Sequence, residues 1–379
     1  MRLVSATVYA LKIPFLAAVR HSLAGRTWSD SVVVRVLDSD GVEGFGEAAP
    51  RPYVTGETPA DVVEHVAGTL WPAVRGLAVP DLRGPGDLAA IEALVPDGGA
   101  AGRHHAARAA MELAVVDWAL RRRRASAALL LPPLRAEVVY SGLITAGSTL
   151  QAVRQARWAR LAGLTQVKIK VGVGADLARV EAVRAVLPDA TIRVDANGAW
   201  TPAAARAALA GLARCRVASV EQPLPPGCPD ALAQLRKESP IPLVLDESVV
   251  TPADLEAHLA AGAADAVNVR VSKCGGFARA VAMARRAAAA GLEIHVGCHV
   301  GETAILSAAG RHLAAGLEPT VFVEGSYGTL LLAEDVSDDG LRFGHRGVAP
   351  VLTRPGWGTR VRVDRLRRYA ETVVELAAS

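Results

Sequence analysis

The sequence predicts an α/β chain in which a (β/α)8 TIM-type barrel follows a smaller α+β domain, and three observations support this fold class. From about residue 137, short apolar runs alternate with helical stretches rich in Ala and Arg. Eight such runs occur, which fits a closed barrel better than an open doubly wound sheet. Three of them end in a carboxylate, at Asp195, Glu221 and Asp246, at steps of 26 (195 to 221) and 25 (221 to 246) residues. A step of that size fits one strand plus one helix.

Residues 1–125 are predicted to form the α+β domain. Within residues 1–50 the pattern indicates an alternating strand at the start and a later strand pair, joined by the turn Ser39-Asp-Gly. A polar loop, residues 21–27, lies between them. Residues 60–124 are mainly helical, and one helix is expected over about residues 104–123, where apolar side chains recur at helical spacing.

The barrel domain is predicted over residues 126–342. Its eight strands are expected at residues 138–143, 166–171, 191–194, 218–220, 243–245, 266–271, 293–297 and 320–323. Residues 343–379 form a C-terminal segment rich in Gly, Pro and Arg. This segment is expected to end in a helix and to pack back on the N-terminal domain.

The composition argues against several classes of protein. With 379 residues and 51% hydrophobic residues the chain can bury a large core, and its formal net charge is only +4. No basic stripe interleaves with aromatic side chains, so no nucleic-acid partner is expected, and no apolar run is long enough for a membrane span. The N-terminus lacks signal-peptide organisation. The four cysteines lack metal-type spacing, which favours reduced thiols in a cytoplasmic protein, and a homo-oligomer is the general expectation.

The three strand-end carboxylates predict a metal site. Neighbouring strands lie about 4.8 Å apart, so Asp195, Glu221 and Asp246 can share one hard divalent cation, Mg²⁺ or alternatively Mn²⁺, at the C-terminal mouth of the barrel. Asn197 shares a strand face with Asp195, and Glu247 follows Asp246, so both can orient the ligands. Each acid alone is more often a helix cap or a solvated loop end, but the equal spacing of the three argues against that interpretation.

Three lysines predict acid–base chemistry beside the metal. Lys168 and Lys170 alternate on the second barrel strand, so both point into the mouth. Their repulsion and desolvation are expected to lower a lysine pKa, as a general base near neutral pH requires; the alternative is that both snorkel to solvent. Lys273 follows the sixth strand, which lies opposite the second in a ring of eight. Lys170 and Lys273 can therefore reach opposite faces of one substrate carbon. Asn268, an inward candidate on the sixth strand, is predicted to bind the substrate, as is Asn197; the alternative for Asn268 is a capping or turn residue.

This combination of groups suits the removal of a proton α to a carboxylate. Such a proton is very weakly acidic, because its loss creates a doubly negative enediolate. A divalent cation on the carboxylate oxygens stabilises that charge as it develops. A small-molecule carboxylate is therefore the expected partner of the site.

At these residues the chain resembles the enolase superfamily, in the subgroup of the muconate-lactonizing enzymes. The matching segments are Lys168-Ile-Lys170, Asp195-Ala-Asn197, Glu221-Gln-Pro223, Asp246-Glu-Ser248 and Lys273-Cys-Gly-Gly276. Residues 44–50, 330–335 and 355–358 also look like segments of this family, so the resemblance covers nearly the whole chain. It implies that the N-terminal α+β domain is a capping domain that closes over the barrel mouth.

The resemblance also implies a role for each matching residue. The implied Mg²⁺ ligands are Asp195, Glu221 and Asp246. Lys170 and Lys273 would form the acid–base pair, a use of lysine with Mg²⁺ that is general in this superfamily. Lys168 would support Lys170 and touch the substrate carboxylate.

Further residues are implied as substrate contacts. Glu302 resembles a glutamate that relatives carry near the metal-bound carboxylate. The capping-domain candidates are His21, Arg51 and Tyr53, which could equally be ordinary exposed loop residues. Dipeptide epimerases of the subgroup carry Asp-x-Asp at the eighth strand to receive a free amino group, whereas this chain has Glu324-Gly-Ser-Tyr327 there. Glu324 is therefore a substrate-binding candidate, and a dipeptide is less expected.

The expected reaction is racemisation or epimerisation of an amino-acid derivative, either an N-acyl or N-alkyl amino acid or a dipeptide. The alternative is a cycloisomerase or dehydratase acting on another carboxylic acid. A more remote alternative is a barrel that only binds. Arg270, which stands where many relatives have a lysine, indicates a changed charge pocket at the sixth strand.

Overall fold

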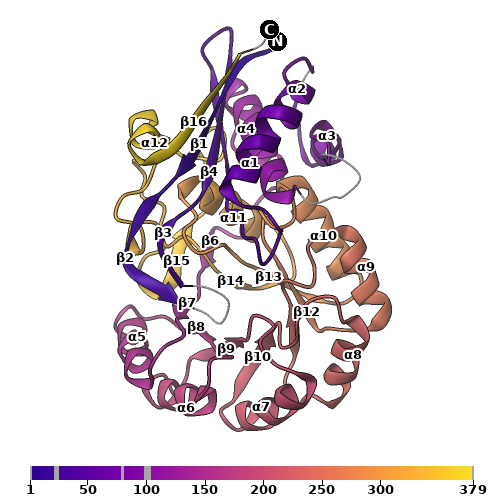
Figure 1. Cartoon of the computed structure of the whole chain (residues 1–379), viewed down its shortest axis with the longest axis vertical. Coiled ribbons are helices and arrows are strands. Elements are labelled where there is room, and N and C mark those ends of the chain that lie inside the picture. The colour runs from indigo at the N-terminus through magenta and orange to yellow at the C-terminus, as the bar shows by residue number, and fades with distance from the viewer. Residues whose placement is uncertain (1, 21–24, 78–80, 98–103, 378–379) are drawn as a thin grey trace.

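The computed structural model describes residues 2–20, 25–77, 81–97 and 104–377, and its largest unit is an eight-stranded parallel sheet (Figure 1). The strands are β7 (Gly142–Ile144), β8 (Gln166–Lys170), β9 (Thr191–Asp195), β10 (Val217–Glu221), β11 (Leu243–Leu245), β12 (Ala266–Val269), β13 (Glu293–Val296) and β14 (Thr320–Val323). They are neighbours in chain order. A parallel bridge between Tyr140 and Val323, with a 2.8 Å bond from Ser141 N to Val323 O, joins the last strand to the first. The sheet is thus the predicted (β/α)8 barrel.

Helices connect these strands around the outside of the barrel (Figure 1). They are α5 (Thr149–Leu161), α6 (Asp176–Val186), α7 (Pro202–Arg214), α8 (Pro229–Glu238), α9 (Pro252–Ala261), α10 (Phe277–Ala289) and α11 (Ala304–Gly316). Ser148, Thr201, Thr251 and Thr303 each cap a helix with a side-chain oxygen that accepts from the first turn. The N-cap of α10 is Gly276, which has no side chain to offer.

The predicted first barrel strand, residues 138–143, is wrong as one element. It is divided into β6 (Glu137–Val139), which pairs antiparallel with β15 (Val348–Pro350), and β7. The chain changes partner at Tyr140, whose N–H donates to Gly347 O at 2.8 Å. The apolar pattern is continuous across the break because Tyr140 is itself buried, so periodicity alone does not reveal the change.

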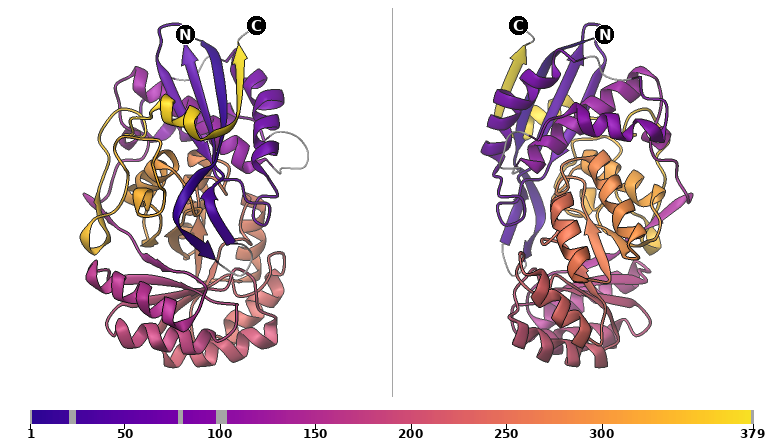
Figure 2. Two further views of the ribbon diagram at one scale, coloured as in Figure 1. Left: turned by 60° about the vertical axis from the view of Figure 1, so that its left-hand side comes forward. Right: turned by 90° about the vertical axis from the view of Figure 1, so that its right-hand side faces the viewer.

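The N-terminal domain contains a four-stranded sheet in the order β16-β1-β4-β5 (Figure 2). Its strands are β1 (Leu3–Leu11), β4 (Val32–Asp38), β5 (Glu43–Ala48) and β16 (Ala370–Ala377). A separate hairpin, β2 (Ile13–Arg20) and β3 (Gly25–Ser29), extends towards the barrel (Figure 1). Residues 25–27, expected in a loop, therefore begin a strand, while residues 21–24 lie outside the described part of the chain.

Helices α1 (Pro59–His65), α2 (Trp71–Val74), α3 (Leu88–Leu94) and α4 (His105–Arg122) complete this domain. A π-helical turn, Val66–Leu70, joins α1 to α2. None of the helices in the described ranges is long and apolar enough to cross a membrane.

The end of the chain also differs from the prediction. The expected terminal helix is only α12 (Val363–Tyr369), and β16 follows it and pairs antiparallel with β1 from Ala370 to Ala377. The segment after residue 342 thus supplies one strand beside β6 and one beside β1. On this basis we propose the division into a capping domain (1–125), a barrel (126–342) and a C-terminal segment (343–379).

Gly44 and Gly46 in β5 let α4 lie directly on the capping-domain sheet. A Cβ at Gly46 would collide with the backbone of Ala110 and Ala114 in α4. We expect Gly46→Ala to lower the free energy of unfolding by about 1–3 kcal/mol through overpacking. Gly310 in α11 faces open space, so Gly310→Ala is expected to raise it by about 1 kcal/mol through helix propensity. Urea unfolding measures the change in the free energy of unfolding for both variants. Changes of the same sign and size in Gly46→Ala and Gly310→Ala would contradict the close packing of α4 on the sheet.

A buried histidine in α11 predicts acid sensitivity. His312 is 2% exposed, and burial lowers its pKa to about 4. The unfolded chain therefore binds a proton that the folded chain does not between about pH 6.5 and 4, so stability is lost as pH falls through that window. The loss amounts to about 3 kcal/mol. Urea unfolding between pH 4 and 7 measures this loss, and His312→Leu is expected to reduce it by that amount, while the lowered pKa values of His65 and His295 keep part of the pH dependence. An unchanged pH dependence in His312→Leu would contradict the prediction.

Candidate active site

The three predicted metal ligands end three consecutive strands of the barrel. Asp195 ends β9, Glu221 ends β10 and Asp246 directly follows β11. Asp195 and Glu221 are register partners in the parallel pair β9–β10. All three carboxylates are almost fully buried, at 0–1% exposure. Because parallel strands end at the same rim, the even spacing in the sequence becomes a cluster of acids at the C-terminal mouth of the barrel.

Lys168 lies at the centre of this cluster. Its Nζ is 3.1 Å from Glu221 Oε1, 3.3 Å from Asp195 Oδ2 and 2.6 Å from Glu324 Oε2. Burial lowers the pKa of Lys168, but the three carboxylates, led by Glu221, outweigh it and raise the pKa above its ordinary value. The expectation of a lowered pKa was therefore wrong for Lys168, because three buried acids surround it rather than one repelling lysine. The three carboxylates therefore favour the charged form of Lys168 in this arrangement.

Lys170 lies one step further along the same strand face, beside Asp195. Its Nζ donates to Asp195 Oδ2 at 2.5 Å and to Asn197 Oδ1 at 3.0 Å. Asn197 adopts a left-handed backbone (φ 45°) and donates from Nδ2 to Glu247 Oε1 at 2.9 Å. Asn197 thus accepts from Lys170, donates from its backbone N–H to Asp195 Oδ1 at 2.9 Å, and is itself held by Glu247.

Lys273 reaches the acids from the other side of the barrel. It follows β12, which is four strands from β8 in the ring. Its Nζ donates to Asp246 Oδ1 at 2.9 Å, Asp246 O at 2.8 Å and Asn268 O at 2.7 Å. Burial lowers the pKa of this fully enclosed amine to about 8, so both of its protonation states are accessible near neutral pH.

Two further ionic groups tie the acids together. Arg270 forms an ion pair with Asp246 and lies 3.6 Å from Glu221. Glu324, after β14, is bonded to Lys168 and, at 3.0 Å, to Arg193. Burial opposes ionisation of Glu324, but the two cations lower its pKa to about 2. Glu324 is therefore a carboxylate whose charge is already compensated inside the barrel.

The donor set suits a hard divalent cation. Asp195 and Glu221 lie within reach of the single amine of Lys168, and Glu221 and Asp246 within reach of Arg270. Carboxylate oxygens are the ligands that Mg²⁺ prefers. In residues 2–20, 25–77, 81–97 and 104–377, however, no group of three acids, histidines or cysteines already faces one point as a metal site would. Metal binding would therefore exchange ion pairs with Lys and Arg for bonds to the cation.

The structure brings most of the predicted substrate residues to this mouth, where they differ in their bonding partners. Asn268 donates from Nδ2 to Glu221 Oε1 at 2.9 Å, so it orients an acid. Glu302, in the loop after β13, accepts from His299 N at 2.6 Å, and burial raises its pKa to about 8. Tyr53 lines the cavity above the acids, and His21 lies outside the described residues.

A small cavity of about 40 Å³ lies between the capping domain and the barrel mouth. Its lining comes from both domains: Arg51 and Tyr53 from the cap, and Lys168, Lys170, Arg270 and Glu324 among those from the barrel. This space is small compared with a typical ligand pocket, so we expect the cap or the lining side chains to move when a substrate binds. Arg51 is 1% exposed and is bonded to Asp30 at 2.8 Å and to Val300 O at 2.7 Å. These bonds fix its side chain on the capping-domain side of the cavity.

Sequence reasoning missed Arg193 and Tyr327. Arg193 precedes Asp195 by two residues and therefore shares its inward strand face, a signal that was available. Tyr327 lies in the loop after β14 and lines the cavity. Its position depends on how that loop folds, and no periodicity in the sequence encodes it.

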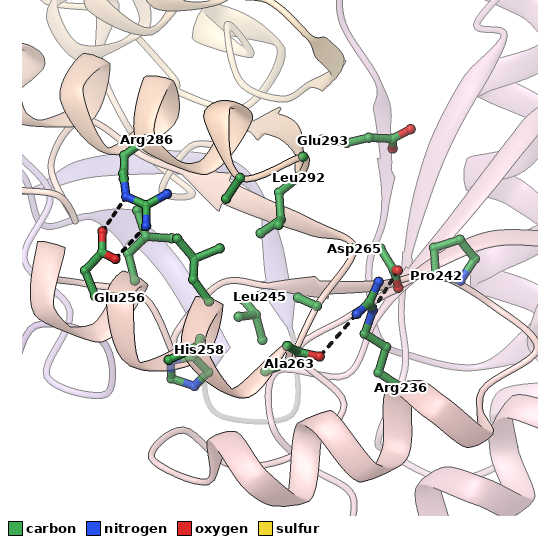
Figure 3. Close-up of a pocket in the computed structure, with 17 residues that line it drawn as sticks. Arg236, Pro242, Leu245, Glu256, His258, Ala263, Asp265, Arg286, Leu292 and Glu293 are labelled. Carbon is green, nitrogen blue, oxygen red and sulfur yellow. Dashed lines mark hydrogen bonds and ion pairs between the residues drawn. The ribbon is translucent and has the colours of Figure 1, made fainter.

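A larger cavity, of about 670 Å³, lies at the opposite end of the strands (Figure 3). Pro242, Asp265 and Glu293 line it, at the starts of β11, β12 and β13. The arginines at its rim, Arg236 and Arg286, are neutralised by Asp265 and Glu256. It contains none of the acids or lysines described above, and the N-terminal end of a barrel serves stability rather than chemistry.

Residues 151–365 match the family described as Enolase C-terminal domain-like. This is more than half of the chain, which therefore belongs to that family, within the enolase superfamily as predicted.

The chain is similar to several individual proteins of this superfamily. The chain is 31% identical to a hydrophobic dipeptide epimerase of Enterococcus faecalis, over 83% of this chain and 87% of that protein. It is 28% identical to an N-succinyl-L-Arg/Lys racemase of Bacillus cereus, over 97% of both. The crystal structure of the B. cereus racemase superposes on this chain with a TM-score of 0.91 and 26% sequence identity. The match covers 99% of this chain and 100% of the racemase. The structure of a 2-chloromuconate cycloisomerase of Rhodococcus opacus superposes with a TM-score of 0.89 and 28% sequence identity. This match covers 98% of this chain and 100% of the cycloisomerase.

Proposed function

We propose that this protein removes the proton α to a carboxylate and returns it on the opposite face, as a racemase or epimerase of an amino-acid derivative. The observation that carries the proposal is the placement of Lys170 and Lys273. They reach the same acid cluster from strands on opposite sides of the barrel. One amine takes the proton and the other supplies one to the opposite face, so a planar intermediate between them loses its handedness. Racemases and epimerases among the relatives support this assignment.

We further propose Mg²⁺ as the cofactor, held by Asp195, Glu221 and Asp246. A bound divalent cation would stabilise the negative charge that develops on the substrate carboxylate. The E. faecalis dipeptide epimerase, 27% identical with a TM-score of 0.85, was crystallised with Mg and a dipeptide. Mn²⁺ is a possible substitute because it favours the same oxygen ligands.

We propose an N-acylated amino acid as the substrate, rather than a dipeptide with a free amine. A free ammonium group needs an uncompensated carboxylate, whereas Glu324 is already bonded to Lys168 and Arg193. The racemase of B. cereus supports this choice, since its name describes N-succinyl amino acids. We propose the cytoplasm as the site of action, since all four cysteines are free thiols. We also propose a homo-oligomer, because most oligomers of soluble proteins are of this kind.

Cycloisomerisation is the second candidate, supported by the likeness to the 2-chloromuconate cycloisomerase. One experiment separates the two. Proton NMR in D₂O with Mg²⁺ follows the protein with N-succinyl-L-arginine, L-Leu-L-Tyr and cis,cis-muconate. The expected result is loss of the α-proton signal of N-succinylarginine, accompanied by a fall in optical rotation as the D-enantiomer forms. Conversion of muconate to a lactone without α-exchange of the amino-acid derivatives would overturn the proposal in favour of cycloisomerisation.

A further inference from the structure

The turn that carries Lys273 is unusually constrained. It joins β12 to α10 and is closed by bonds from Cys274 N to Arg270 O at 2.9 Å and from Gly276 N to Val271 O at 3.0 Å. Gly275 (φ 85°) and Gly276 (φ 133°) follow with backbone angles that favour glycine. Because the Lys273 side chain starts from this turn, the position of its amine depends on where the turn is held.

The capping domain holds the turn on both sides of Lys273. Before it, Ala49 N donates to Ser272 Oγ at 3.1 Å. After it, a guanidinium N–H of Arg108 in α4 donates to Gly275 O. These contacts join elements that are more than 160 residues apart in the chain, so the cap and the turn form one unit.

Glu112, also in α4, completes this grip at the start of α10. Its Oε1 accepts from Ala278 N at 2.9 Å, and its Oε2 accepts from Arg108 at 2.9 Å. Gly276, the N-cap of α10, has no side chain, so a carboxylate from the other domain satisfies the free N–H groups and the helix dipole. A Cβ at Gly276 would collide with this carboxylate. The glycine and the glutamate therefore fit each other across the domain boundary.

We propose that Glu112, together with Arg108, is a positioning residue that sets the Lys273 amine for proton transfer and thereby links the cap to one face of the reaction. This rests on the proposed function. Both side chains are at most 2% exposed, and a buried ion pair contributes little net stability compared with apolar side chains. A role in placing the turn explains why charged groups occupy the position.

The same helix supplies a matched control. Asp117 is also buried, pairs with Arg121 at a spacing of four residues, and accepts from the backbone of Phe45 and Trp357, each at 2.9 Å. It resembles Glu112 in burial, charge and bonding, but it ties no segment that carries a lysine. Asp117→Asn and Glu112→Gln therefore remove equivalent charges with different neighbours.

The test follows α-proton exchange in D₂O from N-succinyl-L-arginine and N-succinyl-D-arginine separately, with Mg²⁺. Lys273→Ala first identifies the enantiomer whose exchange depends on Lys273. Glu112→Gln is expected to slow exchange from that enantiomer by about 10–100-fold, as a displaced catalytic group does, and to change the other little. Asp117→Asn is expected to lower the melting temperature while affecting both enantiomers alike. Equal slowing of both enantiomers by Glu112→Gln, or the same face selectivity in Asp117→Asn, would overturn the proposal.

Amide hydrogen exchange of the full chain without substrate gives a second readout. Glu112→Gln is expected to speed exchange in the peptide covering residues 274–278, and Asp117→Asn in the one around residue 357 instead. No local change at residues 274–278 would refute the proposal even if the activity differed. If the wild type exchanges neither enantiomer, the proposed function fails, while this measurement still decides whether Glu112 holds the turn. Glu112→Asp, which keeps the charge but shortens the reach, replaces Glu112→Gln should that variant not fold.

Discussion

Replacing Lys273 by alanine is expected to abolish α-proton exchange from one enantiomer of the substrate, and replacing Lys170 from the other. Each amine lies on one side of the acid cluster, so under the proposed function each would reach one face of the substrate carbon. The loss on the affected face should be about 10²–10⁴-fold, the usual contribution of a positioned acid or base. Racemisation needs both faces, so either variant should lose the complete reaction. Single-enantiomer exchange in D₂O, followed by NMR, measures the two faces separately.

Lys237 supplies the control for these variants. It lies at the exposed end of α8, so Lys237→Ala should exchange both enantiomers at the wild-type rate. If Lys170→Ala or Lys273→Ala slowed both enantiomers equally, a single base acting on both faces would explain the data better. If neither variant changed the rate of α-proton exchange, the exchange would not depend on these lysines, and the proposed two-base reaction would be wrong.

Much of the barrel could be predicted because its strands are short apolar runs and its chemistry follows the period of a strand. Lys168 and Lys170 share a face by alternation, and Asp195, Glu221 and Asp246 share a rim by equal spacing. These relations are local or repeat regularly, so the sequence displays them directly. The membership of the enolase superfamily follows from the same segments and is confirmed by the family match.

Other features depend on partners that are far apart in the chain. β16 pairs with β1 across almost the whole sequence, so its β-branched run gave no sign of a partner. The ion pair between Arg193 and Glu324 spans 131 residues. This pair compensates the charge of Glu324, which the local sequence around Glu324 does not reveal. The pKa of Lys168 was predicted in the wrong direction for the same reason: its repulsion by Lys170 is visible in the sequence, whereas its three carboxylate neighbours are assembled only by the fold.

Glu221→Gln is expected to weaken Mg²⁺ binding by at least about a hundredfold, since even residues that only support metal ligands cost 10–100-fold when changed. Glu221 is the central acid of the three and lies within reach of Lys168, Asn268 and Arg270. Neutralising it leaves two buried cations beside only two predicted ligands, so electrostatic repulsion adds to the loss of a ligand. Isothermal titration calorimetry with Mg²⁺ alone measures this without any substrate.

The same substitution should reduce α-proton exchange by about 10³-fold on both faces, because it removes charge stabilisation that both lysines share. This distinguishes it from the lysine variants, which affect one face each. A bound ligand raises the melting temperature through mass action, so Mg²⁺ should stabilise the wild type and Glu256→Gln, a change at an exposed ion pair remote from the mouth, but not Glu221→Gln. If Glu221→Gln bound Mg²⁺ as tightly as the wild type, the three-carboxylate site would be wrong, and the ion pairs with Lys168 and Arg270 would be the functional state of these acids.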